Sequence, residues 1–123
     1  MTASAAPPPI LDVIAETTDL ARQLLNVLRR EAEALTAMKL KAPGGFTEAK
    51  TRLISAYAYK LEELRDTPMV PAAEPALADL RVLNDEVMAA ATHNAAVEIR
   101  FIRSLLESAA NTLIRRNDPT LDG

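Results

Sequence analysis

The longest uninterrupted helical pattern of the chain runs from Leu77 to Arg116. It contains no glycine or proline, and Pro75 stands just before it, where a helix can do without an N–H donor. Pro119 follows shortly after it, where a helix cannot continue. We therefore predict a helix over residues 75–116, which forms a rod of about 60 Å at 1.5 Å per residue.

The apolar face of this helix widens toward its C-terminal end. Its first half carries a single apolar stripe, with Asn84 and Asn94 set within it. In its second half the apolar residues sweep about 180° of the helix circumference, whereas packing on one neighbouring helix needs a stripe about 100° wide. Two interpretations follow: this half contacts two other helices of its own bundle, or part of its face receives a partner chain. The residues concerned are Ile99, Phe101, Ile102, Leu105, Leu106, Ala109, Ala110 and Leu113.

Two further helices are predicted, over residues 9–41 and 47–65. The segment Ala42-Pro43-Gly44-Gly45 is the clearest turn signal in the chain, and Thr47 is a plausible N-cap for the second helix. Three prolines between residues 66 and 75 predict a non-helical connector. We thus expect one helical domain over residues 9–117, with a disordered tail at 1–8 and a second tail at 118–123.

Four polar residues lie within apolar helical stripes: Glu31, Lys50, Tyr57 and Asn94. A turn centred on the two adjacent glycines makes the numbers of facing residues sum to about 88–90, by equal rise on both sides. Glu31 then faces Tyr57, and a hydrogen bond from the Tyr57 hydroxyl to Glu31 is predicted. A Glu31–Lys50 ion pair is rejected, because this register separates the two by about 10 Å along the axis.

The other two polar residues have simpler interpretations. Lys50 is expected to lay its methylene groups along the core and keep its ammonium group in water. Asn94 either fixes the register of the helical seam or makes a polar contact to a partner helix.

The predicted fold class is all-α, either an antiparallel three-helix bundle or a long helical hairpin, with coiled-coil-like packing. The middle helix is predicted to be the shorter, at about 27 Å against about 50 Å for the first helix. It therefore cannot cover both long helices along their whole length. The broad C-terminal face of the last helix is the best candidate for the surface left uncovered.

The amino-acid composition excludes several classes of function. The chain has 123 residues, enough for one modest core, with 49% hydrophobic but only 3% aromatic residues, which favours helices over a sheet. A net charge of −3, without a basic patch interleaved with aromatics, argues against a nucleic-acid partner. The absence of cysteine excludes disulfides and thiol chemistry. We find no membrane span and no signal-peptide pattern, and expect a soluble cytoplasmic protein.

Catalytic chemistry finds little support in the sequence. The single histidine, His93, falls on the polar side of its helix. Histidine phosphotransfer domains place a lysine and then a glycine shortly after their histidine, whereas Asn94-Ala95-Ala96-Val97 follows here. There is no Glu-x-x-His pair for a di-iron site and no glycine-rich phosphate loop. We predict no enzyme activity, no cofactor and no metal.

Several of these features together resemble the FlgN family of flagellar export chaperones. The resemblance spans about residues 20–115 and combines a leucine-rich first helix that carries an acidic residue, a K-x-x-L segment, a connector and a long last helix. The residues that carry it are Leu24-Leu25, Leu28, Glu31, Leu35, Lys50-Thr51-Arg52-Leu53, Tyr57 and Asn94.

The resemblance implies a cytoplasmic chaperone that binds the C-terminal amphipathic helix of hook–filament junction proteins, also called hook-associated proteins. It would hold them unassembled before type III export, with components of the export apparatus as further partners. The implied client contacts are Val97, Phe101, Ile102, Leu105, Leu106, Ala109 and Leu113. The alternatives are a structural bundle that forms a homodimer through its wide face, a phosphotransfer module, and a related chaperone for the filament cap.

Overall fold

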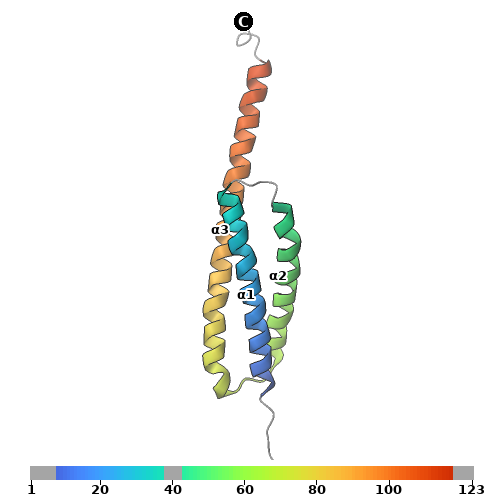
Figure 1. Cartoon of the computed structure of the whole chain (residues 1–123), viewed down its shortest axis with the longest axis vertical. Helices are drawn as coiled ribbons and strands as arrows, with labels where there is room; N and C mark the ends of the chain where they lie inside the picture. Colours follow the sequence, from blue (N-terminus) through green and yellow to red (C-terminus); the bar gives the residue numbers. More distant parts are fainter. Residues whose placement is uncertain (1–7, 38–42, 118–123) are drawn as a thin grey trace, which may run out of the picture.

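The computed structural model describes residues 8–37 and 43–117, where all regular elements are helical and there is no strand. Side chains are described in the same ranges except at 43–45, 101, 105 and 115–117. The elements are α1 (Pro9–Thr36), α2 (Pro43–Asp66), a 3₁₀ turn η1 (Pro71–Ala73) and α3 (Glu74–Asn117). Figure 1 shows the three α-helices packed side by side, with the chain running up, down and up again. The all-helical prediction is confirmed.

α1 is the central helix, because it packs against both α2 and α3. Its buried positions recur every three or four residues and form one continuous face about 120° wide. Thr17 lies within this buried surface with no exposure, and its hydroxyl donates a hydrogen bond to the Val13 carbonyl at 2.6 Å. The hydroxyl is therefore satisfied without a contact to another helix. The buried residues of α1 are Ile10, Val13, Ile14, Thr17, Ala21, Leu24, Leu25, Leu28 and Glu31.

The turn that we predicted at residues 42–45 is wrong in part, because α2 already begins at Pro43. A proline fits the first turn of a helix, and each glycine costs only about 1 kcal/mol relative to alanine within one. Gly44 and Gly45 therefore belong to α2. Residues 38–42 lie outside the described part of the chain, so the predicted end of the first helix at residue 41 is not described.

The relative helix lengths also differ from our prediction. α1 has 28 residues and α2 has 24, which correspond to rods of about 42 Å and 36 Å. The middle helix is thus nearly as long as the first. α3 has 44 residues, about 66 Å, and it is the excess length of this helix that leaves it partly uncovered.

Two ion pairs between α1 and α2, Glu31–Lys50 and Glu16–Lys60, show the register of these helices. Their residue numbers sum to 81 and 76, well below the predicted 88–90. The prediction placed the centre of the turn on the glycines, whereas the break between the helices lies earlier, between Thr36 and Pro43. Each residue of α1 therefore faces a residue of α2 with a lower number than predicted.

The connection from α2 to α3 is short and partly buried. The Thr67 hydroxyl donates a hydrogen bond to the Glu63 carbonyl at 2.6 Å, just beyond the last turn of α2. Pro71 opens η1, and Ala73 within it is completely buried against the core. This connector brings α3 back along α1, where Leu80 and Val87 are buried.

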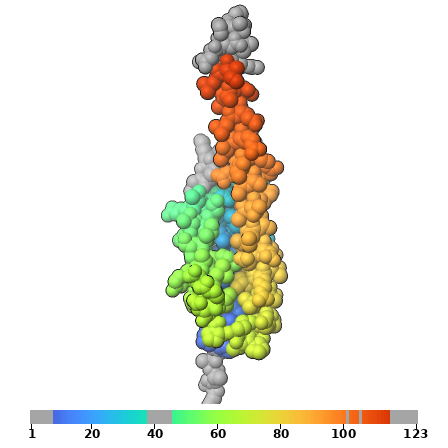
Figure 2. Space-filling view, turned by 180° about the vertical axis from the view of Figure 1, so that it is seen from behind, coloured from blue at the N-terminus to red at the C-terminus, as the bar shows by residue number. Residues whose placement is uncertain are grey.

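α3 divides into two parts with different surroundings. Buried or half-buried side chains recur along it as far as Val97. From Glu98 to Ile114, every side chain that the structure describes is exposed. Figures 1 and 2 show this end of α3 continuing as a single helix past the end of α1 and the start of α2. We call residues 98–117 the projecting segment.

Candidate partner-binding surface

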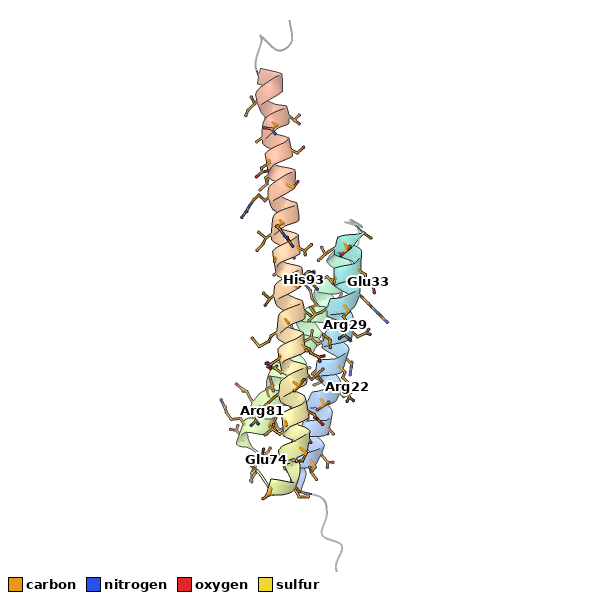
Figure 3. All side chains as sticks on the ribbon, turned by 90° about the vertical axis from the view of Figure 1, so that its left-hand side faces the viewer. Arg22, Arg29, Glu33, Glu74, Arg81 and His93 are labelled. Carbon is orange, nitrogen blue, oxygen red and sulfur yellow. The ribbon has the colours of Figure 1, made fainter. Side chains whose placement is uncertain are left out.

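The projecting segment carries large apolar side chains in contact with solvent. Ile99 is 56% exposed, Ile102 47%, Leu106 66% and Leu113 61%. These residues recur at intervals of three, four and seven, and so form one stripe along the helix. Figure 3 shows side chains extending from every side of this helix, with no second helix beside it. A helix of this kind normally covers such a stripe with a neighbour.

The middle of the stripe forms a shallow apolar depression whose rim is charged on one side. Arg103 and Glu107 supply the charged rim, one helical turn apart. Neither side chain forms an ion pair with any described side chain of residues 8–37 and 43–117. The full lining is Ile99, Ile102, Arg103, Leu106, Glu107 and Ala110. This surface offers apolar contact and two opposite charges.

The predicted client contacts fall into three groups. Ile102, Leu106, Ala109 and Leu113 are exposed on the projecting segment. Val97 is half-buried at its base. The side chains of Phe101 and Leu105 lie outside the described part, so their placement is not described.

Two large exposed apolar residues of the projecting segment were missing from the predicted contacts, as was the small exposed residue Ala110. Ile99 belongs to the stripe and lines the depression. Ile114 is 63% exposed beside it. The three-to-four spacing from Ile99 through Ile102 to Leu106 is the sequence signal that would have included Ile99.

A buried polar network joins the three helices just below the projecting segment. The Lys50 ammonium lies 2.6 Å from Glu31 Oε2. Asn94 Nδ2 donates to Glu31 Oε1 at 2.9 Å and to the Leu28 carbonyl at 2.8 Å. Glu31 is only 5% exposed and Asn94 only 4%. Our rejection of the Glu31–Lys50 pair was therefore wrong, because it followed from the wrong register between α1 and α2.

Asn94 is held in one orientation by this network. Both of its acceptor neighbours require N–H donors, so turning the amide over would place its oxygen against a carboxylate and a carbonyl. Its Oδ1 is buried and has no hydrogen-bond partner in the described part of the chain. Leaving a buried acceptor unpaired costs free energy. A polar residue that tolerates only one alignment is typical of register-fixing positions.

The prediction of a hydrogen bond from Tyr57 to Glu31 was wrong. The Tyr57 hydroxyl donates a hydrogen bond of 2.7 Å to Asn84 Oδ1, which links α2 directly to α3. Burial of the ring disfavours the phenolate and so raises the pKa of Tyr57. In the observed register between α1 and α2, Glu31 lies opposite Lys50 instead of Tyr57. The Tyr57 hydroxyl bonds Asn84 on α3 instead.

Lys60 links α1 and α2 near their other ends. Its ammonium group contacts Glu16, and it lies 3.3 Å from Glu63 on its own helix. The hydrogen bond to Glu16 is the main reason that the pKa of Lys60 is raised. The side chain of Glu16 is 56% exposed, so this ion pair contributes little to stability and mainly helps to align α1 with α2.

The polar residues labelled in Figure 3 lie on the outside of the molecule. His93 is exposed on α3, as are Arg29 and Arg81 on their helices. Within residues 8–37 and 43–117, no three histidine, aspartate or glutamate side chains gather in a way that could hold a metal ion. Over the same ranges, the helices fall short of the length and apolar character that crossing a bilayer requires.

The projecting segment thus exposes an apolar stripe, and the buried polar network lies at the base from which it extends. No protein-family model, curated protein or solved structure matches this chain. The resemblance to FlgN chaperones accordingly depends on the residues quoted for it from the sequence alone.

Proposed function

We propose that the projecting segment of α3 binds an amphipathic helix of another protein. The observation that carries this proposal is the stripe of large apolar side chains on the projecting segment, which no other described helix covers and where Ile99, Leu106 and Leu113 are each more than half exposed. Contiguous exposed apolar surface marks interaction sites in soluble proteins. A helix laid along such a stripe would present its own apolar residues at the same three-to-four spacing.

We further propose the identity of the partner from the resemblance to FlgN chaperones. The client would be the C-terminal amphipathic helix of a hook–filament junction protein, captured in the cytoplasm and kept unassembled until type III export. A client helix that is disordered when free loses conformational entropy on binding, and apolar burial at about 25 cal/mol per Å² must offset this cost. Micromolar to nanomolar affinity, about −8 to −12 kcal/mol, would hold the client and still allow release.

The bundle has a mechanical role in this proposal. α1, α2 and the first part of α3 would form an antiparallel bundle with coiled-coil-like seams, aligned by the Glu31–Lys50–Asn94 network at its upper end. A fixed base reduces the freedom that the projecting segment loses when a client binds, and this preorganisation strengthens binding. No catalytic step is part of the proposed function.

The test is binding of a peptide with the sequence of a junction-protein C-terminal helix, measured by isothermal titration calorimetry. Leu106→Asp should weaken binding at least tenfold, because it places a charge in the centre of the stripe. Ser104→Asp is the matched control, since it adds the same charge to the same turn but about 160° away around the helix. The control should bind like the unmodified protein.

Two results would count against the proposal in different ways. Undiminished binding by a Leu106→Asp variant of native helix content would remove the client from this stripe. Equal affinity for an unrelated amphipathic peptide of matched length and charge would leave helix capture in place but remove the assignment to junction proteins.

A further inference from the structure

We propose that, in the absence of a client, the projecting segment pairs antiparallel with the projecting segment of a second copy of this chain. The inference concerns the free protein and does not depend on what the client is. Its basis is the charge pattern, the side-chain sizes and the position of α2 around the exposed stripe.

The charged rim of the depression is complementary to itself. Arg103 and Glu107 lie on the same flank of the stripe, and both line the depression. When two such helices run in opposite directions with their Leu106 residues at the centre, Arg103 of each copy lies within about 3 Å along the axis of Glu107 of the other, on the same flank. A two-fold axis repeats every contact, so a single arrangement forms two ion pairs between residues that have no ion pair with the described side chains of their own chain. Charges of this kind set alignment and partner choice.

Side-chain sizes also favour the antiparallel alignment. With Leu106 opposite Leu106, Ile99 lies opposite Leu113, and Ile102 lies opposite the small residues Ala109 and Ala110. A large residue opposite a small one fills the layer between two helices evenly. A parallel pairing in register would instead set alanine against alanine at residue 109 and leave that layer underfilled.

The position of α2 disfavours the parallel alternative. Asn84, which accepts the hydrogen bond from Tyr57 on α2, lies only about 30° around α3 from the centre of the exposed stripe. Below the projecting segment, α2 therefore occupies the side on which a parallel copy would have to continue. An antiparallel copy places its own bundle at the opposite end, beyond residue 117.

The size of the contact predicts weak association. The projecting segment is about 30 Å long, and a helix is about 10 Å wide, so two such segments share a narrow strip. Such an interface falls in the small class typical of transient complexes. A dimer of this kind would shield the stripe of the free protein and exchange readily, which suits a surface that must also open to another helix.

The first test is the mass of the full chain in solution without peptide, measured by sedimentation equilibrium from about 1 μM to about 1 mM, a range that covers weak affinities. We expect a monomer–dimer equilibrium. Leu106→Asp should weaken it at least tenfold, while Ser104→Asp should leave it unchanged. A mass that stays monomeric at every concentration overturns the proposal, and so does a dimer that Leu106→Asp leaves intact.

Direction can be tested by crosslinking, because the chain contains no cysteine and an introduced one is unique. Under mild oxidation, Leu106→Cys should form a disulfide-linked dimer, since the two-fold axis brings this position against itself. Ile99→Cys alone should not, because the two copies of residue 99 are about 20 Å apart in an antiparallel pair. A mixture of Ile99→Cys and Leu113→Cys should crosslink. Efficient crosslinking of Ile99→Cys to itself would overturn the antiparallel arrangement.

The charge pairs supply an independent test. Arg103→Glu and Glu107→Arg should each weaken self-association, since each places like charges opposite one another in both pairs. A mixture of the two variants should associate again, because every glutamate then faces an arginine. Failure of the mixture to associate better than either variant alone would overturn the proposed alignment. None of these measurements involves a client, so their outcome is separate from that of the peptide-binding test.

Discussion

Both parts of α3 carry large apolar side chains at three-to-four spacing, but in opposite environments. Along the bundle, Leu80 and Val87 are buried against α1, whereas Ile99 and Leu106 remain more than half exposed on the projecting segment. The difference comes from the neighbouring helices, because α3 continues past the end of α1 and the start of α2. An apolar stripe in the sequence therefore shows that one face of a helix is suited to burial, but not that this face is buried. The length of the adjacent helices decides whether it is buried within its own chain.

The largest difference between the two parts should appear in core truncation. Leu24→Ala removes a side chain that is 3% exposed in the bundle and should lower the free energy of unfolding by about 2–5 kcal/mol. Leu106→Ala removes the same atoms from a side chain that is 66% exposed and should change it by less than about 0.5 kcal/mol. Urea denaturation at low protein concentration measures both. Equal losses would mean that the projecting segment is covered in the free monomer.

The buried polar network should give the next largest effect. Lys50→Met leaves the Glu31 carboxylate buried without its ion pair and should cost about 2–4 kcal/mol of stability, somewhat less than for a fully buried pair because Lys50 keeps some contact with water.

The exposed Arg29–Glu86 pair between α1 and α3 supplies the control. Its charged atoms lie 3.9 Å apart on exposed side chains, so Arg29→Met should cost at most about 1 kcal/mol. If the two substitutions cost the same by urea denaturation, the network at the base of the projecting segment is not a specific alignment device.

The smallest expected effect is the dependence of folding stability on alkaline pH. Because burial raises the pKa of Tyr57 above its unfolded value, the folded state keeps this proton longer than the unfolded chain does. The contribution of Tyr57 to stability is therefore complete below about pH 10 and is lost as pH rises through the raised pKa. The raised pKa of Lys60 acts in the same direction.

Tyr57→Phe should lower stability near neutral pH by about 1 kcal/mol, through loss of the hydrogen bond to Asn84. The same substitution should also make the loss of folding stability above about pH 10 less steep. Tyr59→Phe, at a position that is 70% exposed, is the control and should change neither property. An unchanged alkaline slope in Tyr57→Phe would show that the phenol is not the group responsible. Thermal unfolding followed by circular dichroism across pH supplies both quantities.

Much of the helical architecture was accessible from the sequence. The helix predicted over residues 75–116 is observed as Glu74–Asn117, and the first helix begins at Pro9, as predicted. These features depend on local periodicity and on prolines at helix ends, which act within a few residues along the chain. Ile102, Leu106 and Leu113, which spacing and the FlgN resemblance named as client contacts, are exposed; their contact with a client stays a prediction.

Only the tertiary structure decided which polar groups meet. Glu31 pairs with Lys50 and Asn94, and Tyr57 reaches Asn84, because α2 begins at Pro43 and this shifts every contact between α1 and α2 from the predicted register. Local preferences cannot fix that register, since a helix can begin at a proline or after a glycine pair at a difference of only about 1–2 kcal/mol. The amino-acid sequence by itself therefore determined the helices and their apolar faces. Packing among the helices determined the register, the buried polar network and the length of α3 that stands uncovered.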